Sequence, residues 1–295
     1  MRAFLLDPYR LGFMSRALVE VLLIGTLGAV VGVHVALRRL AFVTDAVQHT
    51  VFPGIAVAYA VGWPLLPGAA AAAGLTVALL VALTSGRRKV DVDSALALII
   101  ASFFAVGVVV VSRRTGYAAD LGGLLFGRIL DVSRAEVIET AVLGGLCLLV
   151  LALLHKELVL LALDRTQAAA LGLPVVLLDA VLYAVTATTV VVAVRAIGTV
   201  LVVAFVVTPA ATGRLLTKSI PGAMAAGAAV AAVLGWIGLS ASYEASLNHN
   251  VRLAAGATVV VAYTLGFAAA GAARILLRRR ARRRAPVADA ASIAA

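Results

Sequence analysis

The sequence predicts an all-α, polytopic membrane protein with about nine transmembrane helices. Of its 295 residues, 63% are hydrophobic and only 13% are charged, and the mean hydropathy is +1.09. A soluble surface needs far more charge than this. One span uses about 20 apolar residues, so the spans leave only short connections. These observations exclude a Rossmann enzyme, a receptor ectodomain and a self-contained ATPase.

Long apolar runs mark the expected spans, and charges, proline and glycine separate them. The runs cover residues 17–37, 41–62, 65–85, 93–112, 135–154, 175–194, 197–213, 221–240 and 253–275. We therefore expect an N-terminal segment at 1–16, a transmembrane domain at 17–277 and a basic tail at 278–295. The single cysteine, Cys147, excludes an internal disulfide and a cysteine-built metal site.

The basic residues predict the orientation of the chain in the membrane. Arginines between residues 278 and 284 place the C-terminus in the cytoplasm, where basic residues are retained. On this count the 155–174 connection is cytoplasmic and the N-terminus is external. The arginines of the 113–134 connection depart from the rule, and a re-entrant segment is the alternative there. The net charge of +11 is thus a topology signal, and no nucleic-acid partner is expected.

A carboxylate and an imidazole interrupt the second apolar run. Asp45 and His49 are spaced i, i+4, which puts them on one face of a helix. Ionisable residues inside a membrane are costly and are usually functional. An oxygen and a nitrogen ligand suit zinc, manganese or iron, although a buried structural pair or a proton relay would use the same spacing. Pro53 and Gly54 follow one turn later and allow a bend or gate.

A short helix is predicted in the cytoplasmic connection, between residues 164 and 172. Asp164 is a suitable N-cap, the alanines that follow favour a helix, and Gly172 with Pro174 ends it. Such a helix either rests on lipid headgroups or docks on a soluble partner and receives its movements.

Together these segments resemble the membrane permease subunit of ABC transporters for zinc, manganese or iron. That family carries an Asp and a His in an early span, followed by Pro-Gly, as in Asp45, His49, Pro53 and Gly54. Further segments of the chain resemble the family's motifs at residues 124–130, 164–172, 196–204, 208–212, 242–243 and 256–258. Gln48 departs from the family pattern, which usually has a small serine before the histidine.

The resemblance implies the permease subunit of an ATP-driven divalent metal importer in the bacterial inner membrane. Its partners would be ABC ATPase subunits, an extracellular metal-binding protein, the lipid bilayer and a second permease, in a homodimer or a heterodimer. The metal ion would be cargo, and no permanently bound cofactor is expected. The residues implied are Asp45 and His49 for the metal, Asp164, Arg165, Ala168 and Gly172 for docking of the ATPase, and Pro53, Gly54 and Pro209 for a gate or bend.

The sequence contains no P-loop, so ATP hydrolysis is expected in a separate subunit and the chain itself is not expected to be an enzyme. One alternative is a secondary transporter driven by an ion gradient, with Asp45 and His49 as a proton relay. Another is an intramembrane hydrolase with His49 as a metal ligand, for which Asp179 is the only obvious further ligand. Glu20 and Arg195 lie near external helix ends and are expected to snorkel to headgroups.

Overall fold

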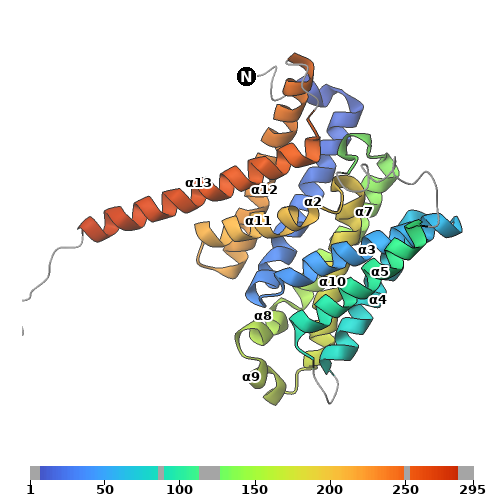
Figure 1. Cartoon of the computed structure of the whole chain (residues 1–295). Coiled ribbons are helices and arrows are strands. Elements are labelled where there is room, and N and C mark those ends of the chain that lie inside the picture. The colour runs from blue at the N-terminus through green and yellow to red at the C-terminus, as the bar shows by residue number, and fades with distance from the viewer. Residues whose placement is uncertain (1–6, 86–89, 113–126, 249–252, 285–295) are drawn as a thin grey trace, which may run out of the picture.

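The structure is a computed structural model that describes residues 7–85, 90–112, 127–248 and 253–284. Within these ranges the chain is helical and contains no strand (Figure 1). In chain order the elements are η1 (Asp7–Arg10), α2 (Gly12–Leu37), α3 (Ala41–Val61), α4 (Leu65–Ser85), α5 (Val92–Ser112), η2 (Ile129–Asp131), α7 (Arg134–Leu153), α8 (His155–Leu163), α9 (Arg165–Ala170), α10 (Val175–Ile197), α11 (Val202–Leu216), α12 (Ile220–Asn248) and α13 (Ala255–Arg284).

Every apolar run that the sequence predicts is a helix, which confirms the all-α fold class. Seven of the described helices are long and apolar enough to cross a membrane, namely α2, α4, α5, α7, α10, α12 and α13. The other two predicted spans are α3 and α11. Polar residues between Thr44 and Thr50 lower the hydropathy of α3, and α11 has only 15 residues. The predicted number of about nine is therefore approximate.

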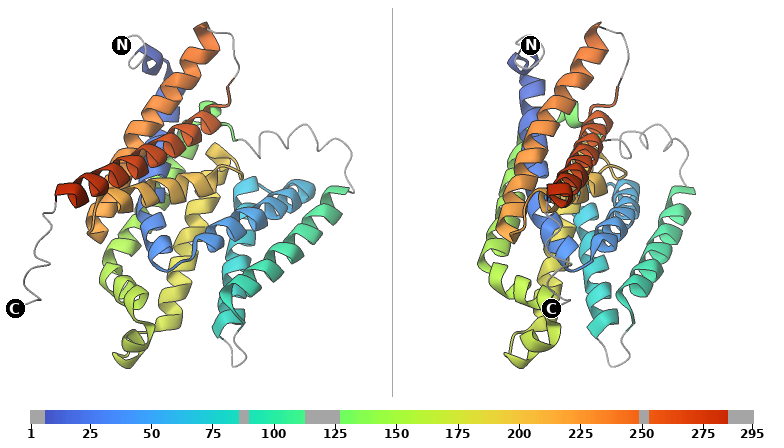
Figure 2. Two further views of the ribbon diagram at one scale, coloured as in Figure 1. Left: turned by 60° about the vertical axis from the view of Figure 1, so that its left-hand side comes forward. Right: turned by 90° about the vertical axis from the view of Figure 1, so that its left-hand side faces the viewer.

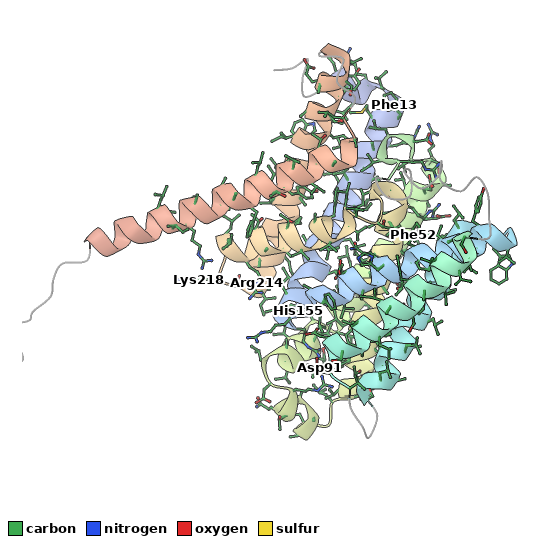
Figure 3. All side chains as sticks on the ribbon, viewed as in Figure 1. Phe13, Phe52, Asp91, His155, Arg214 and Lys218 are labelled. Carbon is green, nitrogen blue, oxygen red and sulfur yellow. The ribbon has the colours of Figure 1, made fainter. Side chains whose placement is uncertain are left out.

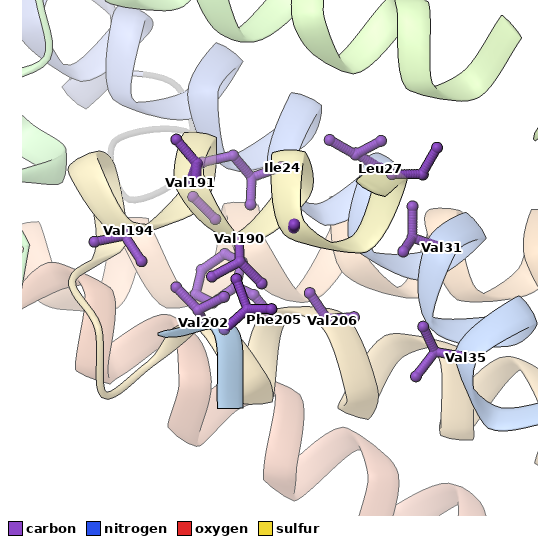
Figure 4. Packing of buried hydrophobic residues seen from close by; sticks show 14 of the residues in the cluster. Ile24, Leu27, Val31, Val35, Val190, Val191, Val194, Val202, Phe205 and Val206 are labelled. Atoms are coloured by element: carbon purple, nitrogen blue, oxygen red, sulfur yellow. The ribbon is translucent and has the colours of Figure 1, made fainter. Parts of the chain in front are cut away.

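Two groups of helices meet along α2 and α10. On one side α3 packs against α4 and α5, and on the other α11, α12 and α13 pack against one another. Helix α2 contacts α7, α11 and α12, while α10 contacts α2, α3, α4 and α7. Their shared core is made of aliphatic side chains from α2, α10 and α11 together with Phe205, which lies beside Val190 and Val202 (Figure 4). Close packing of these side chains between the helices provides the van der Waals contacts that stabilise helix association in lipid.

Different helices form the two ends of the molecule. Helices α8 and α9 lie at one end, and the start of α2 lies at the opposite end (Figures 1 and 2). Figure 3 likewise places His155 and Asp91 at the end opposite to Phe13. A connection that the sequence predicts to be cytoplasmic therefore shares its end of the molecule with the junction between α2 and α3, which is the approach to Asp45.

Candidate metal-binding and docking sites

Asp45 and His49 lie side by side on α3, as their spacing predicts. His49 Nε2 is 3.7 Å from Asp45 Oδ1, and the two side chains are 56% and 35% exposed in the single chain. Their neighbours Ala46 and Val47 are fully buried. The pair therefore faces away from this chain's own bundle, so a further ligand has an open direction of approach.

Gln48 holds the carboxylate of Asp45 in place. Its Nε2 donates a hydrogen bond of 2.7 Å to Asp45 Oδ1, and the Gln48 side chain is only 6% exposed. The Gln48 Oε1 and the hydroxyl of the buried Thr44 have no hydrogen-bond partner among the described residues. A ligating carboxylate is commonly oriented by such an outer hydrogen bond. In the sequence, Gln48 is visible only as a departure from the family pattern, and its contact with Asp45 comes from the structure.

Pro53 and Gly54 lie where α3 crosses two neighbouring helices. Pro53 has no amide donor for the carbonyl of His49 one turn earlier, so that carbonyl is available for other partners. A Cβ on Gly54 would lie 2.3 Å from the Cβ of Ala72, and a Cβ on Gly107 would lie 2.9 Å from Pro53. These contacts with α4 and α5 require the glycines, whereas a gating role for the Pro-Gly pair stays a prediction.

The described residues contain no group of three His, Cys, Asp or Glu side chains that could hold a metal ion together. Asp45 and His49 are thus a pair, and a metal bound there needs ligands from elsewhere. Asp179, the further ligand required by the hydrolase alternative, instead accepts hydrogen bonds from Arg38 and Arg165. That alternative consequently has no ligand from a neighbouring helix beside His49 in the part of the chain that the structure describes.

Glu20 and Arg195 do not snorkel to headgroups, and that expectation was wrong. Glu20 is 1% exposed and accepts a 2.7 Å hydrogen bond from Thr140. Arg195 binds the carboxylates of Glu136, at 3.1 Å, and Glu139. Together they line a cavity of about 20 Å³, which has room for one water molecule. Partners on a neighbouring helix replace the headgroups because α7 presents its acidic first turns to α2 and α10.

Helix α9 has the local structure that the sequence predicts. The Asp164 carboxylate accepts hydrogen bonds from the backbone amides of Thr166 and Gln167, at 2.8 and 2.9 Å, which makes it the N-cap. The helix ends at Ala170, and Gly172 then adopts a positive φ of 79°, which favours glycine. Ala168 is fully buried, so the opposite side of this one-turn helix faces outward.

Two exposed leucines flank α9, and the sequence gives no sign of their role. Leu163 is 75% exposed and Leu171 is 65% exposed. They come just before Asp164 and just after Ala170, so an apolar residue stands at each end of the polar helix. Exposed apolar side chains at this position are available for contact with a partner or with lipid.

The second predicted bend, Pro209, lies inside α11 and is buried. Its missing amide leaves the carbonyl of Phe205 without its usual helical donor. A Cβ on Gly28 of α2 would lie 2.6 Å from that same oxygen. The carbonyl that Pro209 leaves without its helical donor therefore lies where α2 and α11 pack closely together.

Comparison with known proteins gives a consistent result. A family model described as "ABC 3 transport family" matches residues 10–273. The manganese transport system membrane protein MntC of Halalkalibacterium halodurans is 33% identical, over 88% of this chain and 86% of the relative. The chelated iron transport system membrane protein YfeC of Yersinia pestis is 28% identical, over 90% of this chain and 88% of the relative.

A solved structure shares the fold. PsaBC from Streptococcus pneumoniae in complex with Fab matches with a TM-score of 0.77 and 28% identity. The match covers 92% of this chain and 95% of that chain. The helix that carries Asp45 and His49, and the helix that Asp164 caps, therefore belong to an arrangement that a solved structure also has.

Proposed function

Because this chain belongs to the ABC 3 transport family, we propose that it is the permease subunit of an ATP-driven importer of manganese or iron. The observation that carries the proposal is the Asp45–His49 pair, which lies on an open face of α3. An oxygen and a nitrogen ligand suit both metals, whose selection depends on geometry and supply as well as on ligand type.

Two permeases complete the metal site in this proposal. The described part of one chain offers a pair of ligands here, and a stable site for a first-row cation needs about four to six. A second permease that faces the exposed side of α3 would bring another such pair. The metal ion then lies on the path between the two subunits as transient cargo. The Gln48 hydrogen bond keeps the Asp45 carboxylate oriented before the metal arrives, which lowers the entropy cost of binding.

The orientation in the bacterial inner membrane follows from charge. The end of the molecule with α8 and α9 carries Arg38, Arg39 and Lys156, and basic residues favour the cytoplasmic side. We infer that α9 lies in the cytoplasm and that the start of α2 lies outside, where an extracellular metal-binding protein would dock. The arginines between residues 278 and 284 are expected on the cytoplasmic side as well, because basic residues are retained there.

An ABC ATPase is the partner proposed for α9. The capped helix presents polar residues outward, and the exposed Leu163 and Leu171 add an apolar contact at each end. Ala168 lies on the buried side, so it supports the helix from below and does not meet the partner directly. ATP binding and hydrolysis in the partner would then move α9 and, through it, the helices of the pore.

Reconstitution tests the proposal. The chain, its ATPase and its binding protein are placed in proteoliposomes, and uptake of manganese and iron is measured with ATP, without ATP and with an imposed proton gradient. The expected result is metal uptake that requires ATP and does not depend on the proton gradient. Uptake that follows the gradient without ATP would instead establish the secondary transporter.

Replacing Gln48 with leucine is expected to raise the KM for metal uptake about tenfold, with a smaller change in the maximal rate. Leucine has a similar size but cannot donate the hydrogen bond to Asp45, so the carboxylate loses its orientation. The matched control is Thr44→Val, which changes a neighbouring buried side chain whose hydroxyl has no partner. Equal KM values for the two variants would show that the Gln48 contact does not serve metal binding.

A further inference from the structure

One buried carboxylate connects three separate elements at the end of the molecule that carries α8 and α9. Asp179, in α10, is 8% exposed. Its Oδ1 accepts a hydrogen bond from Arg38 Nη2, and its Oδ2 accepts one from Arg165 Nη2 at 2.7 Å. Arg38 directly follows α2, and Arg165 is the first residue of α9. A single side chain therefore holds the docking helix against the ends of two long helices.

The low exposure of Arg38 and Asp179 strengthens the ion pair between them. The side chains of Arg38 and Asp179 are each 11% exposed, so water screens their attraction only weakly. Removal of the carboxylate would leave the Arg38 guanidinium, whose Nη1 already lacks a partner, buried without a counter-charge. The side chain of Arg165 is 55% exposed. Of the three charged residues Asp179, Arg38 and Arg165, it is therefore the one on the surface of the molecule.

Arg38 lies close along the chain to the helix that carries the metal-binding pair. Only Arg39 and Leu40 separate it from α3, and this connection is fixed, because the Leu40 amide donates a 2.8 Å hydrogen bond to the Val35 carbonyl. Asp45 follows in the second turn of α3. A movement of Arg38 would thus displace the beginning of the helix that holds Asp45 and His49.

A second contact joins the same parts of the molecule. The ring of His155, the first residue of α8, packs edge-on against the buried ring of His34 in α2, with 5.5 Å between their centres. The segment that contains α8 and α9 is thereby attached at two points, to the last turn of α2 through His155 and to α10 through Arg165. Two attachments prevent α9 from pivoting freely about either one.

We propose that Asp179 is a positioning residue that transmits the movement of α9 to the metal-binding helix α3, through Arg165 on one side and Arg38 on the other. The inference rests on the proposed function, because it takes α9 as the place where the ATPase acts. It adds the physical link between that place and the Asp45–His49 pair. Chains of packed side chains and salt bridges of this kind can carry coupling energy between distant sites.

The test compares metal moved with ATP hydrolysed in the same proteoliposomes. Asp179→Asn and Arg165→Gln each remove one charge of the cluster and are expected to lower the number of metal ions moved per ATP about tenfold. Arg165→Lys keeps the positive charge and is expected to restore most of this ratio. The double variant should be no worse than Asp179→Asn alone, because both changes break the same contact.

Controls separate coupling from folding. Asp131→Asn removes a carboxylate that is 81% exposed in η2, and its ratio should equal that of the wild type. Asp179→Asn risks misfolding because it leaves the charge of Arg38 unpaired. Arg165→Gln changes a half-exposed side chain and does not carry this risk. A variant that merely folded poorly would lose transport and hydrolysis together and keep the ratio.

The outcomes are distinguishable. A wild-type ratio in Arg165→Gln and Asp179→Asn, with ATP-driven uptake intact in the wild type, would overturn the role of Asp179 and leave the proposed function standing. A wild-type complex that takes up no metal with ATP would refute the proposed function and the inference with it. A reduced ratio in both variants, restored by Arg165→Lys, would establish the link.

Discussion

Metal uptake is expected to fall about 100-fold or more when His49 is replaced by alanine, and by a similar amount when Asp45 is replaced. Each chain contributes only this pair, and the described residues provide no third ligand beside it. Loss of either side chain therefore removes half of what one subunit gives to the metal. The measurement is the initial rate of manganese uptake into proteoliposomes that contain the complete transporter and ATP.

The control for this prediction is Asp93→Asn. Asp93 is an exposed carboxylate in the first turn of α5, so its change to asparagine removes one negative charge, as Asp45→Ala does. Uptake by Asp93→Asn is expected to stay near that of the wild type. If ATP-driven uptake survived in both Asp45→Ala and His49→Ala, the metal would not bind at this face of α3 during transport.

Gly32→Ala is expected to lower the free energy of unfolding by about 3 kcal/mol. A Cβ on Gly32 would lie 2.1 Å from the Val206 carbonyl oxygen and 2.8 Å from the Cβ of Ala210. The first of these atoms belongs to the backbone of α11 and cannot turn aside. The two helices would have to separate, and the contacts of the aliphatic core between them would be lost. Unfolding by heat or by sodium dodecyl sulfate in mixed micelles measures the effect.

Gly145→Ala is the matched control, because Gly145 is also a helical glycine but nothing lies within 4 Å of a Cβ placed on it. Alanine favours a helix over glycine by up to about 1 kcal/mol. The control variant is thus expected to be as stable as the wild type or slightly more stable. Similar losses in Gly32→Ala and Gly145→Ala would mean that the close approach of α2 and α11 does not limit stability.

Much of the fold follows from the sequence because the membrane imposes a simple condition. Backbone amides and carbonyls in lipid must pair within their own segment, so every long apolar run has to be a helix. The boundaries follow from charges, proline and glycine. The less certain elements are those where this condition is weakened, namely the polar α3 and the short α11.

Features of the candidate sites that depend on neighbours along the chain were equally predictable. The i, i+4 spacing put Asp45 and His49 on one face of α3, and the cap formed by Asp164 needs only the next three residues. Gln48 was visible as an unusual residue, but spacing alone did not reveal that its amide holds Asp45.

The sequence by itself therefore determined the helices, the single face shared by Asp45 and His49, and the local structure of α9. Only the tertiary structure decided that Asp179 binds Arg38, which lies 141 residues away, and that Glu20 binds Thr140 at a distance of 120 residues. The physical reason is that these helices are apolar around most of their circumference. No polar stripe then indicates which face meets protein and which meets lipid, so the partners of buried charges are fixed only by the close packing of the helices.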